Sequence, residues 1–61
     1  MLTPKNIRIA IKEGYGTLYL IKRYDLAGEK QLFDFVERWF TDSDRIISVL
    51  RKNQRNMDKK K

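Results

Sequence analysis

The side chains of this chain that could do acid–base chemistry are two pairs of carboxylates. Asp34 and Glu37 are three positions apart, and Asp42 and Asp44 are two positions apart. A catalytic pair needs a walled pocket that gives its two groups different protonation states, and a chain of 61 residues leaves little room for one. The chain has no His and no Cys, which removes the commonest general base, the thiol nucleophile and the usual zinc ligands. We therefore expect no enzyme, no metal site, no cofactor and no small-molecule substrate.

The segment Gly14-Tyr15-Gly16 is the other candidate for chemistry, because glycine-rich loops can surround a phosphate group. It lacks the G-x-G-x-x-G spacing, and the residues after it alternate in polarity. Two glycines around one residue instead favour a tight turn between two strands.

Two runs of alternating polarity flank this turn and predict two β-strands, at residues 6–12 and 17–24. Joined through residues 13–16, they would form a hairpin with one apolar face. That inner face would consist of Ile7, Ile9, Ile11, Leu18 and Leu20.

Helical spacing replaces alternation after Asp25, where a helix could begin, or slightly later at Gly28. Its apolar stripe comprises Leu32, Phe33, Phe35, Val36, Trp39 and Phe40. A second helix should start near residues 41–44, with a stripe of Ile46, Ile47, Val49 and Leu50 that fades after about residue 51. The fold class predicted is therefore α+β, a β-hairpin followed by two α-helices packed on one face (ββαα). We expect this small two-layer domain over residues 1–56, and a disordered basic C-terminal tail over residues 57–61.

The net charge of +6 is concentrated at the C-terminal end of the chain, since residues 45–61 contain seven Lys or Arg and one acidic residue. Such clustering favours a polyanionic partner. We expect a small regulatory protein that binds nucleic acid non-specifically through its C-terminal helix and tail, with a salt-sensitive affinity. The residues predicted to contact nucleic acid are Arg51, Lys52 and Arg55 on the helix and Arg8, Lys12, Tyr19 and Arg23 on the outer hairpin face.

A second interpretation of the outer hairpin face is an interface with a larger protein. Tyr19, Ile21 and Ala10 would form it, and the protein would act as a compact inhibitor or adaptor of the kind that mobile genetic elements encode. An unpaired hairpin edge could also join two copies into a homodimer or add a strand to a partner. No apolar run approaches the roughly 20 residues that span a bilayer, so we expect a cytoplasmic protein without a membrane partner.

Overall fold

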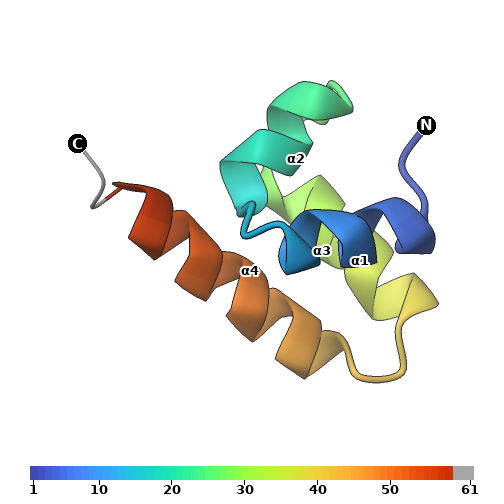
Figure 1. Cartoon of the computed structure of the whole chain (residues 1–61). Coiled ribbons are helices and arrows are strands. Elements are labelled where there is room, and N and C mark those ends of the chain that lie inside the picture. The colour runs from blue at the N-terminus through green and yellow to red at the C-terminus, as the bar shows by residue number, and fades with distance from the viewer. Residues whose placement is uncertain (59–61) are drawn as a thin grey trace.

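The computed structural model describes residues 1–58, and within this range every regular element is an α-helix (Figure 1). The four helices are α1 (Pro4–Lys12), α2 (Thr17–Arg23), α3 (Glu29–Trp39) and α4 (Ser43–Asp58). The predicted α+β fold is therefore wrong, because both segments predicted to be strands are helices. No hairpin face and no strand edge exist in the described part of the chain, which also removes the predicted homodimer through a hairpin edge.

Helix α1 forms because both of its ends are capped. The Thr3 hydroxyl accepts a hydrogen bond from the Asn6 amide at 3.2 Å, and Pro4 occupies the first helical position, where no amide is needed. At the other end Gly14 adopts a φ of +88°, and its amide donates to the Ile11 carbonyl. The next amide donates five residues back, to Ala10, and completes a Schellman motif. The glycine predicted to turn a hairpin therefore ends a helix.

The apolar residues of α1 and α2 also fit helical spacing. Ile7, Ala10 and half-buried Ile11 make the inner face of α1, whereas Ile9, which a strand would have buried, is 50% exposed. Thr17 and Leu20 of α2 are buried, and the C-cap residue Tyr24 packs against the core, at spacings of three, four and seven.

Asp25, one of the two residues at which the sequence allows a helix to begin, instead follows the end of α2, and the other, Gly28, precedes α3. Asp25 has a φ of +54° and follows the last turn of α2, where its amide donates to the Lys22 carbonyl. The next amide, that of Leu26, donates to Ile21 at 2.9 Å. This arrangement again closes a helix C-terminus with a left-handed residue. Asp25 thus caps the end of α2, and α3 begins after Gly28.

The two predicted helices in the second half of the chain are confirmed as α3 and α4. The prediction that Trp39 packs in the core is wrong, because this residue is 61% exposed; its ring lies beside that of Phe35, with ring centroids 6.1 Å apart. Helix α4 extends to Asp58, two residues into the segment predicted to be a disordered tail. The remaining residues of that tail, 59–61, lie outside the described residues.

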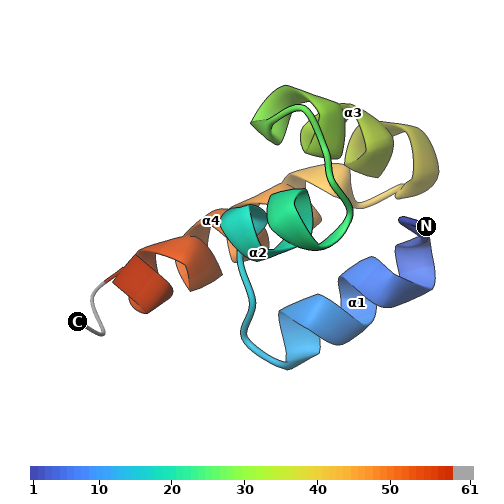
Figure 2. The same ribbon diagram turned by 90° about the horizontal axis from the view of Figure 1, so that it is seen from above.

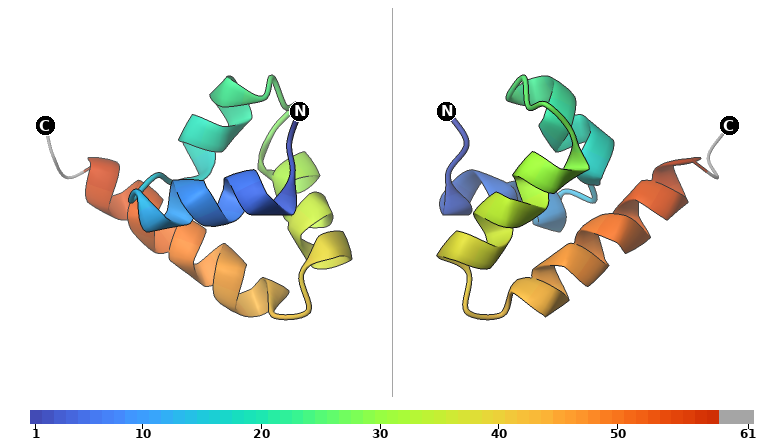
Figure 3. Two further views of the ribbon diagram at one scale, coloured as in Figure 1. Left: turned by 45° about the vertical axis from the view of Figure 1, so that its right-hand side comes forward. Right: turned by 180° about the vertical axis from the view of Figure 1, so that it is seen from behind.

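The helices enclose one core, with α1 and α3 on opposite sides of α2 and α4 (Figure 2). Helices α3 and α4 form a hairpin that opens toward α2, as the views in Figure 3 show. The core residues come from all four helices and the α3–α4 connection: Ile7, Ala10, Leu20, Leu32, Val36, Phe40, Ile46 and Leu50.

Polar side chains attach the second half of α4 to the first two helices. The Asn53 side-chain amide donates to the backbone carbonyls of Ile11, at 3.4 Å, and Tyr15, at 3.1 Å. The Gln54 side-chain oxygen accepts a hydrogen bond from the amide of Leu18 at 2.9 Å, near the start of α2. Contact with α4 therefore continues past residue 51, through hydrogen bonds to backbone groups at the end of α1 and the start of α2.

Candidate nucleic-acid interface

Helix α1 carries a row of cations on its exposed side. Lys5, Arg8 and Lys12 are three and four positions apart, so they share one face of the helix over about 10 Å. The segment Pro4–Lys12 contains no acidic residue and has a charge of +3. The Arg8 guanidinium lies 4.9 Å from the centre of the Phe40 ring. Phe40 lies in the connection between α3 and α4, so this contact places Arg8 beside that connection.

Two further cations lie on the flank of α4 that faces α1. The hydrogen bond from Asn53 to the Ile11 carbonyl identifies this flank, and Val49 lies four residues earlier on it. Arg45 and Lys52 adjoin Val49 at helical spacings of four and three, and both are exposed. Both rows border the same seam between α1 and α4. We name Lys5, Arg8, Lys12, Arg45 and Lys52 the basic face.

The other predicted cations of α4 lie on its opposite flank, toward α2 and α3. Arg51 lies 5.1 Å from the centre of the Phe33 ring, and Arg55 lies with Glu29 and Thr17 around a shallow depression. Arg51 and Lys52 are neighbours in sequence, but the helix directs them to different surfaces. Of the three α4 residues predicted to bind nucleic acid, only Lys52 therefore belongs to the basic face.

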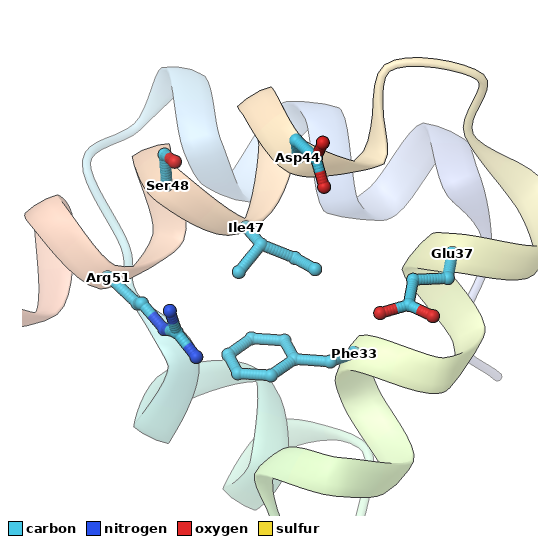
Figure 4. A pocket seen from close by; sticks show the side chains of 6 residues that line it. All are labelled: Phe33, Glu37, Asp44, Ile47, Ser48 and Arg51. Atoms are coloured by element: carbon cyan, nitrogen blue, oxygen red, sulfur yellow. The ribbon is translucent and has the colours of Figure 1, made fainter.

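Arg51 lines a groove between α3 and α4 whose charges are mixed (Figure 4). Its apolar floor consists of Phe33 and Ile47, and Glu37 and Asp44 lie at the end away from Arg51. The groove has a volume of about 370 Å³ and is open to solvent. Two carboxylates beside one guanidinium disfavour a polyanion here.

The predicted outer hairpin face is divided between the two helices that replace the strands. Tyr19 is half-buried and stacks on Tyr15, with ring centroids 3.9 Å apart and planes within 12°. The Arg23 guanidinium lies 5.5 Å from the centre of the Tyr24 ring at the end of α2. The structure therefore places Tyr19 and Arg23 on α2 and does not bring them together with Arg8 and Lys12 through a common sheet.

The residues predicted to form a protein interface are separated in the same way. Ala10 is only 5% exposed and lies in the core, on the side of α1 opposite its cations. Ile21 is half-buried on α2. A helix turns successive residues through 100°, whereas a strand would have aligned these side chains on one outer face.

Acidic residues border the basic face at two points: Glu13 follows Lys12 as the C-cap of α1, and Asp42 and Asp44 adjoin Arg45 near the start of α4. Helix α3 has three acidic and two basic residues and a charge of −1, and Asp44 lines the α3–α4 groove. Within residues 1–58 no three Asp or Glu side chains gather closely enough to hold a metal ion. For the same residues, no helix combines the length and apolar character needed to cross a bilayer.

Lys5 and Arg45 are the members of the basic face that were not predicted. Lys5 precedes the run assigned to a strand, and only helical spacing aligns it with Arg8 and Lys12. Arg45 was recognised as part of the basic C-terminal segment but was not assigned a contact. The packing of α4 on α1 places Arg45 on the basic face.

Comparisons of the chain with protein-family models, with curated proteins and with solved structures find no match.

Proposed function

We propose that the protein binds nucleic acid through phosphate contacts made by the basic face. The observation that supports this proposal is the gathering of five cations on two adjacent helices, without an acidic residue in α1. Cations that neutralise phosphates release condensed counterions, which lowers the free energy of binding without selecting a sequence. The protein would act in the cytoplasm, wherever nucleic acid is accessible, by occupying or masking it.

Charge distribution favours this surface over the α2–α3 unit. Two helices joined by a short connection are the arrangement in which DNA-binding helix-turn-helix proteins insert the second helix into a groove. Here that second helix would be α3, which contains Glu29, Asp34 and Glu37 and has a charge of −1. Its carboxylates would face phosphates, so we assign phosphate binding to α1 and α4 instead.

Substitution of matched cations tests the proposal. The variant Lys5→Ala/Lys12→Ala/Lys52→Ala removes three charges from the basic face and leaves Arg8 on the Phe40 ring. Its control removes the same charge elsewhere, at Lys22, Lys30 and Arg38, which are exposed on α2 and α3. Both variants have the same net charge, so any difference between them reports the position of the cations.

Fluorescence anisotropy with labelled nucleic acid, measured between about 50 and about 200 mM salt, is the readout. For the basic-face variant, the slope of log K against log salt should fall by up to about 2.7, which is about 0.9 for each lost phosphate contact. The control should retain most of the wild-type slope. Equal losses in the two variants, or no binding by the wild type at low salt, would contradict the proposal. Point substitutions are needed because truncation of residues 51–61 would remove Asn53 and Gln54, which hold α1 and α2.

Binding to a larger protein is the second candidate function, on a different surface from the one predicted. Trp39 favours it, because a tryptophan that is 61% exposed beside Phe35 is typical of residues that dominate protein interfaces. Trp39→Ala should then abolish co-purification of that protein and leave nucleic-acid affinity unchanged. Unchanged co-purification would exclude Trp39 as the contact.

A further inference from the structure

The outer side of α1 combines its cations with an exposed apolar residue. Ile9 is 50% exposed and lies immediately after Arg8, three positions before Lys12 and four after Lys5. Core packing does not account for Ile9, because the inner side of α1 consists of Ile7, Ala10 and Ile11. At 100° per residue, Ile9 lies about 40° from Lys5 and about 60° from Lys12, at the edge of the cation row away from Arg8. A partner that complements this side must offer anions along the row and a less polar surface beside it.

The major groove of duplex DNA has these properties. It is about 12 Å wide, admits one α-helix between two phosphate strands, and exposes thymine methyl groups on its floor. Helix α1 has nine residues, which corresponds to a length of about 13 Å. Resting on the proposed function, we infer that the partner is duplex DNA and that α1 occupies its major groove. Arg45 and Lys52 contact the adjacent phosphate strand, and Ile9 faces the base edges.

The composition of the basic face separates duplex DNA from other nucleic acids. Proteins that hold single strands stack the bases on exposed aromatic rings, but neither Pro4–Lys12 nor Ser43–Asp58 contains an aromatic residue. Phe40, the ring that Arg8 contacts, is buried, and Tyr15, 38% exposed just after α1, has its ring stacked on Tyr19. Duplex RNA has a major groove that is too deep and narrow for a helix. We therefore expect the protein to bind duplex DNA more tightly than either single-stranded DNA or duplex RNA.

The experiment compares three labelled probes of the same sequence and length: duplex DNA, single-stranded DNA and duplex RNA. It also compares Ile9→Glu with Leu18→Glu, since Leu18 is 49% exposed on α2 and the two variants change the net charge equally. Circular dichroism verifies that each variant is helical. Ile9→Gln replaces Ile9→Glu if the latter does not fold. Competition with methyl green, which fills the major groove, and with netropsin, which fills the minor groove, locates the protein on the duplex.

We expect the wild-type protein to bind duplex DNA most tightly of the three probes. Methyl green should displace the protein from the duplex, whereas netropsin should not. Ile9→Glu should bind the duplex at least about tenfold more weakly than Leu18→Glu. Equal affinity for the three probes, equal effects of the two Glu variants, or displacement by netropsin alone would overturn the inference. In each of these cases phosphate binding by the basic face would stand. Failure to bind any probe at low salt would instead refute the proposed function itself.

Discussion

Substitution of Gly16 by alanine tests how closely α4 approaches the start of α2. A Cβ atom added to Gly16 would lie 2.5 Å from the Gln54 backbone nitrogen, 2.6 Å from its Cα and 2.8 Å from its Cβ. These atoms belong to the helix itself and cannot rotate away, so α4 and the α1–α2 connection must separate. The φ of Gly16 is −111°, which any residue can adopt. The cost of the substitution therefore comes from the close approach and not from backbone strain.

The magnitude follows from the contacts that this separation weakens. Overpacking at a rigid contact costs about 1–3 kcal/mol of unfolding free energy. The hydrogen bonds from the Leu18 amide to Gln54 and from Asn53 to the Tyr15 carbonyl cross the same contact, and each contributes about 1 kcal/mol. If each bond loses about half of its contribution, Gly16→Ala costs about 2–4 kcal/mol in total. A domain of 61 residues has only about 3–9 kcal/mol of stability. The melting temperature should therefore fall by at least about 8 °C.

The other two glycines provide matched controls. An added Cβ meets nothing within 4 Å at either Gly14 or Gly28. Gly14→Ala should cost about 1 kcal/mol, because a φ of +88° disfavours any side chain. Gly28→Ala should cost about 0.5 kcal/mol through a poorer helix N-cap. Urea unfolding followed by circular dichroism measures all three variants. A Gly16→Ala protein as stable as Gly28→Ala would refute the close approach of α4 to Gly16.

Three further predictions address the fold, and chemical unfolding of the variants tests each of them. Leu20→Ala should cost about 2–5 kcal/mol and Leu18→Ala less than about 0.5 kcal/mol, because only Leu20 is buried; similar losses would indicate that α2 is a strand with both residues inward. Asn53→Asp should be less stable than Asn53→Ala, since a carboxylate would direct an acceptor at two backbone carbonyls. The reverse order would exclude the hydrogen bonds from the Asn53 side chain to these carbonyls. Asp25→Gly should stabilise the protein by about 0.5–1 kcal/mol by relieving a left-handed φ of +54°; any loss of stability would show that the Asp25 side chain is needed.

The sequence correctly predicts the second half of the fold because α3 and α4 have long stripes that fit only a helix. The first half fits two periodicities at once. Ile7 and Ile11 are two of three residues in an alternating run, and they are also four apart, with Ala10 between them on the same helical face. A short apolar run cannot decide between these readings. Its boundaries could have decided, because Thr3-Pro4 is a helix start and Gly14 a helix end.

Two polar residues in the second half of α4 extend its contact with the other helices beyond the apolar stripe. Asn53 and Gln54 interrupt the apolar stripe and thus predicted that α4 leaves the core near residue 51. In the structure they form hydrogen bonds to backbone groups at the C-terminal end of α1 and the N-terminal end of α2. Such a contact is invisible to hydropathy, because it depends on which helix end lies beside α4.

The candidate site depends on this tertiary contact as much as the fold does. Charge alone indicates that Arg8, Lys12 and Lys52 are available to a polyanion, but the predicted fold puts them on separate surfaces, a hairpin and the C-terminal helix. A helical α1 adds Lys5 to the first row, and the Asn53 hydrogen bond to the Ile11 carbonyl orients α4 so that Lys52 borders that row. The same orientation directs Arg51 toward Phe33. A substitution that removes the Asn53 hydrogen bonds should therefore lower both the stability of the fold and the affinity for nucleic acid, whereas Lys52→Ala should lower only the affinity.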